Sequence, residues 1–218
     1  MLKRMLIGEF HTSLVLKNKS NRMKKSVLGI IIVVAILALF VFLGIATYNN
    51  LVSKEEAVKA QWANVENVYQ RRADLIPNLV ATVKGYATHE EKTLTEVVEA
   101  RAKATQVVIN PSKLNDANVS AYENAQNGLT GALSRLLVSV ERYPDLKANQ
   151  NFLDLQSQLE GTENRIAVER RKYNEVAQQF NTMIRSFPAN LIAGMGKFEI
   201  KGYFKSTESA SVAPIVKF

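Results

Sequence analysis

The chain has 218 residues, 47% of them hydrophobic and 22% charged, with two histidines and no cysteine. This composition is typical of one globular domain; it excludes disulfide scaffolds, thiol nucleophiles, iron–sulfur clusters and cysteine-ligated zinc, and two histidines cannot form a three-histidine metal site. The net charge of +8 does not indicate nucleic-acid binding, because seven basic residues and one acidic residue lie in residues 1–25, and the rest of the chain holds 21 basic against 19 acidic side chains.

The first predicted element is a membrane span. Residues 27–46 are 20 consecutive apolar residues, VLGIIIVVAILALFVFLGIA. As an α-helix this run is about 30 Å long, the thickness of the hydrocarbon core of a bilayer. A core helix of a soluble protein is seldom apolar on every face over this length. We therefore predict a single-pass transmembrane anchor over residues 26–47.

The charges on either side of the span predict its orientation. Seven basic residues precede it, whereas only Lys54 and Lys59 follow within about 20 residues. The positive-inside rule then places residues 1–25 in the cytoplasm as a basic tail, the span in the inner (cytoplasmic) membrane, and the body of the chain on the other side.

Two alternatives concern the N-terminal region. The sequence Gly44-Ile45-Ala46 offers a small-x-small cleavage site, which would release a secreted helical protein, although the apolar run exceeds the usual signal-peptide core of about 7 to 15 residues. Met23 is a natural start for such an anchor, so residues 1–22 are either a short tail or a misassigned start.

Residues 48–188 are predicted to form an elongated antiparallel four-helix bundle. Two long helices, over residues 53–86 and about 149–187, carry apolar side chains at alternating steps of three and four residues. The seam of the first is Val58, Trp62, Val65, Tyr69, Arg72, Ile76, Leu79, Val83 and Tyr86. Short connections between neighbouring helices favour an up-down-up-down arrangement.

Two shorter helices are expected between the long ones. Each opens with a capping-box pattern, Thr88 with Glu91 and Ser120 with Glu123. The first ends before Pro111 and the second at Pro144, with residues 111–119 as a loop. Residues 189–218 are expected to be an irregular tail that packs on or near the bundle, with a short extended piece over residues 198–205.

Three polar residues stand in the apolar seams of the long helices. They are Arg72 in the first helix and Thr162 and Glu169 in the fourth. If Tyr86 is level with Phe152, Arg72 lies opposite residue 166, and its side chain can reach Glu169. We therefore predict a buried or half-buried Arg72–Glu169 pair, with Thr162 on the same seam, that sets the helix register.

The block around Pro77 and the C-terminus are the candidates for partner binding. Proline lacks the N–H that would bond the carbonyl of Ala73, so a kink is expected at Pro77, and that carbonyl needs another donor. A structural bend and a docking feature are both open interpretations of the block, whose candidate partner-binding residues are Arg71, Asp74 and Asn78. The apolar terminus, ending at Phe218, is of the kind that carboxylate-gripping modules bind, or it packs on its own domain.

No catalytic, cofactor-binding or metal-binding residue is predicted. His89 has no recognisable nucleophile beside it, and residues 141–147 alternate charges at a turn that Pro144 explains. Four thin helices leave little room for a substrate pocket, so an enzyme and a small-molecule substrate are not expected.

Several long, collinear blocks resemble the LemA family. They are YNNLV from Tyr48, RRADLIPNLVATVKGYATHE from Arg71, ERYPDLKANQNF from Glu141, LEGTENRIAVERRKYN from Leu159 and RSFPANLIAG from Arg185. The resemblance runs from the span to Phe218, departs over residues 107–119 and does not include residues 1–22. It implies a membrane-anchored helical bundle without an established biochemical role.

The resemblance also bears on partners. Genes of this family often neighbour those of heat-shock-type membrane zinc metalloproteases and small envelope proteins, which implies a role in envelope stress or protein quality control. We therefore expect a membrane-anchored scaffold or adaptor that binds envelope proteins, a membrane metalloprotease among them. The oligomeric state is left open.

Overall fold

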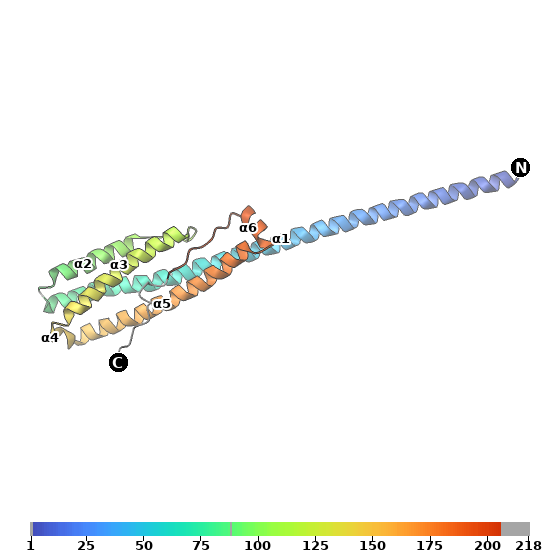
Figure 1. Ribbon diagram of the computed structural model, residues 1–218. Helices are drawn as coiled ribbons and strands as arrows, with labels where there is room; N and C mark the ends of the chain where they lie inside the picture. The colour runs from blue at the N-terminus through green and yellow to red at the C-terminus, as the bar shows by residue number, and fades with distance from the viewer. Residues whose placement is uncertain (1, 88, 206–218) are drawn as a thin grey trace, which may run out of the picture. The chain divides into compact units, whose positions relative to one another are not determined.

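The computed structural model describes residues 2–87 and 89–205, with side chains from residue 27 onward. The prediction of an all-α fold is confirmed, because these residues form six helices and no strand. Helix α1 spans Leu2–Tyr86, and the chain divides within it into two compact units, Met1–Asn49 and Asn50–Phe218. Figure 1 gives the course of the chain and the labels of its helices.

The unit Met1–Asn49 is helical in its described part. Its apolar side chains face outward, from Val27, 54% exposed, to Phe42, 69% exposed. Among the described residues, one helix is long and apolar enough to cross a membrane, and its apolar stretch begins at Val27. A helix that exposes large apolar side chains on all faces needs an apolar solvent around it.

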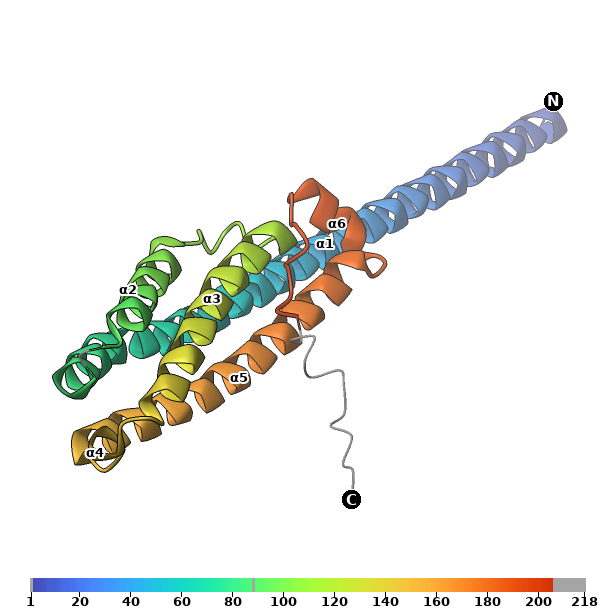
Figure 2. The same cartoon turned by 60° about the vertical axis from the view of Figure 1, so that its left-hand side comes forward.

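The unit Asn50–Phe218 packs the later part of α1 with the other helices. These are α2 (Glu91–Gln106), α3 (Asp116–Val140), α4 (Pro144–Lys147), α5 (Gln150–Arg185) and α6 (Ala189–Met195). Figures 1 and 2 show α3 and α5 alongside α1, α2 beside α3, and α6 at the end of α5. The long α5 is capped at its start by Asn149, whose side chain accepts the N–H of Phe152 at 3.1 Å.

The predicted capping box at Ser120 does not open its helix. Helix α2 begins at Glu91, so His89 precedes the helix, and Thr88 lies outside the described residues. Helix α3 begins at Asp116, four residues before Ser120, because the side chain of Asn115 accepts the N–H of Asn118 at 2.9 Å. An earlier cap was available, so the second half of the expected loop is helical.

The interior of this unit consists of two clusters. One is rich in aromatic side chains and contains Trp62, Tyr122, Tyr173, Phe180 and Phe204. The other is largely aliphatic, from Ile76 and Leu79 on α1 to Leu129 and Leu136 on α3. We call them the aromatic cluster and the aliphatic cluster.

The C-terminal segment, expected to be irregular, begins with a helix. Helix α6 buries Ala189 and Ala193, and small side chains on one face allow a short helix to lie close to the core. Residues 198–205 then run without regular secondary structure back along α5. Phe204, near the end of this segment, is 4% exposed and belongs to the aromatic cluster.

Candidate functional site

A buried arginine ties three helices together. Arg72 on α1 is 1% exposed, and its Nη1 donates to Oε1 of Glu163 on α5 at 2.6 Å and to Oγ1 of Thr130 on α3 at 2.8 Å. Its Nη2 donates to Oε1 of Gln126 at 2.7 Å and to the main-chain oxygen of the same residue at 3.2 Å. Charge-assisted bonds to two other helices hold the guanidinium in one place.

Arg72 also lies against the ring of Tyr69. The guanidinium carbon lies 5.1 Å from the centre of the Tyr69 ring, a cation–π distance. Burial raises the pKa of Tyr69, although the charges of Arg170 and Arg72 oppose that effect. Tyr69 therefore stays a neutral phenol at physiological pH.

The carbonyl freed by Pro77 has a specific donor. Helix α1 continues through Pro77 to Tyr86. The main-chain oxygen of Ala73 accepts Nε of Arg101, on α2, at 2.7 Å. The expectation that this carbonyl needs another donor is thus confirmed, and the missing hydrogen bond of one helix becomes a contact with the next.

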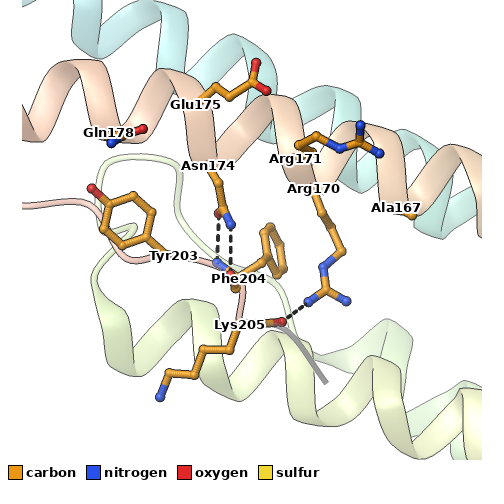
Figure 3. A pocket seen from close by; sticks show the side chains of 9 residues that line it. All are labelled: Ala167, Arg170, Arg171, Asn174, Glu175, Gln178, Tyr203, Phe204 and Lys205. Carbon is orange, nitrogen blue, oxygen red and sulfur yellow. Dashed lines mark hydrogen bonds between the residues drawn. The ribbon is translucent and has the colours of Figure 1, made fainter. Parts of the chain in front are cut away.

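Two asparagines on α5 hold the C-terminal segment by its main chain. Asn181 accepts the N–H of Lys201 and donates to its carbonyl, both at 2.8 Å. Asn174 makes the same pair of bonds with Phe204, at 3.0 and 2.8 Å (Figure 3). Seven helical residues rise about 10.5 Å and three extended residues about 10 Å, so the two spacings match.

Side chains of the held segment add to this grip. Phe204 stacks on Trp62, with ring centres 5.7 Å apart and planes 7° apart. Lys201 is 2% exposed, and its Nζ donates to Oε1 of Glu55 at 2.6 Å. A β-carbon on Gly202 would lie 2.7 Å from Cα of Asp116, so only glycine allows the segment to pass α3 this closely.

A groove beside this segment is the first candidate for a binding site. It has a volume of about 720 Å³ and is lined by α5 from Ala167 to Gln178 and by residues 203–205. Figure 3 shows that Asn174 and Arg170 point from α5 toward the segment. Arg170 donates to the carbonyl of Lys205 at 2.7 Å and pairs with Glu123. The central polar side chains of the groove therefore bind the protein's own chain.

The described residues contain no group of three or more histidines or carboxylates that could hold a metal ion. The polar contacts of Arg72, Arg101, Asn174 and Asn181 instead join one helix, or the C-terminal segment, to another. The Asn50–Phe218 unit is a helical framework whose C-terminal segment is held against α5.

Comparison with known proteins places this framework in a family. The sequence profile of the LemA family matches residues 61–218. The chain belongs to the LemA family. The match covers all the helices of the Asn50–Phe218 unit except the first residues of its α1 part.

Curated relatives of this LemA-family chain include magnetosome proteins. It is 26% identical to magnetosome protein MamQ 2 of Paramagnetospirillum magneticum and 25% identical to MamQ of Magnetospirillum gryphiswaldense. Each match spans 93% of this chain and 81% of the relative. Protein LemA of Metamycoplasma hominis is 23% identical over 72% of this chain and 68% of the relative. Family, relatives and the apolar helix together indicate a membrane-associated helical protein.

The predicted Arg72–Glu169 pair is wrong in its partner. Glu169 is half-buried; its carboxylate accepts Nε2 of Gln61 at 2.6 Å and Nζ of Lys172 at 2.9 Å, and these bonds lower its pKa. The error lies in the assumed register. The hydroxyl of Tyr86 accepts Nδ2 of Asn149 at 2.9 Å, so Tyr86 is level with a residue three positions before Phe152. The same shift brings Glu163 to Arg72.

The other residues singled out in the sequence have separate surroundings. Thr162 is buried, but its hydroxyl donates to the carbonyl of Gln158 within α5 at 2.7 Å. Arg71, Asp74 and Asn78 are exposed on α1. Phe218 lies outside the described residues.

Sequence reasoning did not find the residues that hold the C-terminal segment. Asn174 and Asn181 are seven residues apart and each follows a buried aromatic residue, Tyr173 or Phe180. Two asparagines at heptad spacing beside an apolar seam were a signal that something polar lies against that face. Their partner could not be predicted from the sequence, because they bind main-chain atoms, which are the same in every residue.

Proposed function

We propose that this LemA-family protein is an inner-membrane adaptor that binds other envelope proteins. Residues 26–47 are its anchor, residues 1–25 its cytoplasmic tail, and residues 48–188 a bundle on the outer side of the membrane. The process is envelope stress or protein quality control, with a membrane metalloprotease among the partners. The relatives named as magnetosome proteins agree with work at a membrane.

One observation carries the adaptor proposal. Arg71, Asp74 and Asn78 are exposed on α1, whereas Arg72 and Ala73, between them, are buried and bonded to other helices. We call these three residues the α1 strip. Residues at i, i+3 and i+7 share one helix face, so the strip presents a cation, a carboxylate and an amide side by side. A rigid backbone beneath a polar surface lowers the entropic cost of binding.

Site-specific photo-crosslinking in intact cells tests the strip. A photoreactive amino acid at Asp74 or Asn78 should give adducts with an envelope protein, identified by mass spectrometry. The matched control is the same amino acid at Asn164, an exposed position on α5. Adducts of equal yield at Asn164, or none at the strip, would rule the strip out. Phe218 is the second candidate contact, and a chain that lacks it tests that contact. If adducts at the α1 strip disappear when Phe218 is removed, the strip and Phe218 bind the same partner.

The orientation has its own test, helped by the absence of native cysteine. A cysteine at exposed Ser112 should react with a membrane-impermeant thiol reagent in intact spheroplasts. Labelling only after lysis would contradict the orientation. N-terminal sequencing of the mature protein separates a retained anchor from cleavage after Ala46.

The anchor is tested by charge. Ile32→Arg with Leu37→Arg places two charges near the bilayer centre at about 2.5 to 3.5 kcal/mol each, which should move the protein out of the membrane fraction. The matched control, Glu91→Arg with Glu99→Arg, also adds arginines, but at exposed positions of α2, and should stay in the membrane fraction.

A further inference from the structure

The corner between α5 and α6 carries an exposed apolar surface. Phe187 is 81% exposed, Leu191 59% and Met195 82%, at spacings of four residues. We call these three residues the corner surface. Helix α6 turns Ala189 and Ala193 into the core on its other face, so the outward position of Leu191 and Met195 is a consequence of how α6 packs. Three large neighbouring apolar side chains in contact with water indicate a surface that is covered in use.

The contacts between α1 and α5 locate this corner at one end of the unit. Arg72 meets Glu163, Gln61 meets Glu169, and Nζ of Lys54 donates to Gln179 at 3.0 Å. Numbers fall on α1 as they rise on α5, so the helices are antiparallel. Helix α5 continues six residues beyond Gln179, about 9 Å, whereas Leu51 is three residues, about 4.5 Å, before Lys54. The corner surface therefore lies at or beyond the level of Leu51.

The covalent chain limits how far this end can be from the bilayer. Leu51 is five positions after Ala46, the last apolar residue of the span. Even fully extended, five residue steps cover about 18 Å, and as a helix about 7.5 Å. The headgroup layer on one side of a bilayer occupies about 5 to 8 Å of that distance. The corner surface is thus held within reach of the membrane surface whatever the angle between the units.

We propose that the corner surface inserts into the headgroup layer of the bilayer as a second membrane contact. Phe187, Leu191 and Met195 enter the boundary between headgroups and acyl chains, with α6 lying in the plane of the interface. Exposed Arg185 and Lys197, at the two ends of this corner, face the phosphates of anionic lipids. The consequence is a fixed orientation of the bundle on the membrane. This proposal rests on the anchor proposed above.

Lipid-quenching of a site-specific fluorophore tests the proposal on the full-length chain. Single cysteines at Leu191 or Met195 carry an environment-sensitive dye, and the protein is reconstituted into vesicles of phosphatidylcholine and phosphatidylglycerol that contain a lipid with a spin label close to the headgroup. Both dyes should lose most of their emission to this quencher, and their emission should be shifted to the blue relative to that of the free dye in buffer. Vesicles of phosphatidylcholine alone should give weaker quenching.

The matched control is a cysteine at Val138, an apolar side chain that is 72% exposed near the end of α3. Its neighbour Val140 packs in the aliphatic cluster with Val83 and Ala87, at the other end of α1, so its dye should not be quenched. Circular dichroism should show the same helix content for all labelled variants, because the substituted side chains are exposed.

The outcomes separate this proposal from the anchor. If the vesicles float with the protein but dyes at Leu191 and Met195 are quenched no more than the dye at Val138, the corner contact is wrong and the anchor stands. A dye shielded from water yet not quenched by lipid would assign the corner to a protein partner or a second copy, and would also overturn the proposal. Protein that does not float with vesicles contradicts the anchor and the corner contact together.

Discussion

Around Trp62 the interior of the Asn50–Phe218 unit is aromatic and takes Phe204 from a segment without regular structure, whereas around Leu136 it is aliphatic and takes its large side chains from helices. The aliphatic cluster follows from heptad spacing, because leucine, isoleucine and valine at steps of three and four pack between antiparallel helices. The aromatic cluster is incomplete without the C-terminal segment. One end of this LemA-family fold is therefore closed by helix packing, and the other by the C-terminal segment.

The largest expected effect comes from removing the aromatic ring of Phe204. Phe204→Ala should lower the free energy of unfolding by about 3 to 5 kcal/mol, because it empties a buried ring site, and Leu136→Ala by about 2 to 5 kcal/mol. Trp62 is the single tryptophan, so its emission reports on the aromatic cluster alone. Native-state emission should change in Phe204→Ala and stay as it is in Leu136→Ala. An emission change in Leu136→Ala as large as that in Phe204→Ala would mean that the two clusters are not separately closed.

The next effect concerns the ion pair of Arg72, which lies at the boundary between the two clusters. Glu163→Ala leaves a buried guanidinium without its carboxylate and should cost about 2 kcal/mol, less than a fully buried pair because Glu163 is 43% exposed. The matched control Glu169→Ala should cost less than about 1 kcal/mol. Denaturant unfolding of both, alone and with Arg72→Met, should show coupling for Glu163 and additivity for Glu169. Coupling of Arg72 to Glu169 would restore the register expected from the sequence.

A smaller effect concerns the tie between α1 and α2. Arg101→Met leaves the Ala73 carbonyl without a donor and should cost about 1 to 3 kcal/mol. Pro77→Ala supplies an N–H at the position that can bond this carbonyl within α1. The same Arg101 substitution should therefore cost less in the Pro77→Ala background. Equal costs in the two backgrounds, measured by thermal unfolding, would show that Arg101 acts through something other than that carbonyl.

The smallest effect at neutral pH is expected at Tyr173, in the aromatic cluster. Its hydroxyl is buried and finds no hydrogen-bond partner among the described residues, so Tyr173→Phe should change stability by less than about 1 kcal/mol at pH 7. Burial raises the pKa of Tyr173 and of Tyr122 above the ordinary value near 10.

The pH dependence of these tyrosines has a defined sign. A phenol whose pKa is higher in the folded state contributes its full stability below pH 10, and that stability falls as the pH rises above 10, where the unfolded chain loses the proton first. Stability measured from pH 9 to 12 should fall less steeply in Tyr173→Phe than in the parent chain. Equal slopes would mean that the pKa of Tyr173 is the same in the folded and the unfolded chain.

The fold class could be predicted from the sequence because apolar spacing is a local property. Residues 27–46 could be recognised as a span because the helical rise matches the length of this apolar run to the thickness of a bilayer. The seams of the long helices could be recognised from the helical period of their apolar residues. The donor requirement at Ala73 followed equally from the chemistry of Pro77. The α1 strip was singled out by residue type, and its exposure agrees with its place opposite the seam.

What the tertiary structure decided was which polar groups meet. A shift of three residues, about one helical turn, exchanges Glu169 for Glu163 at Arg72, and it depends on how α4 and Asn149 connect α3 to α5. Phe204 reaches Trp62 only because Asn174 and Asn181 bond main-chain atoms of the returning segment, whatever its side chains are. Periodicity determines which face of a helix is buried; register and main-chain contacts depend on the whole packed chain, so sequence alone left them open.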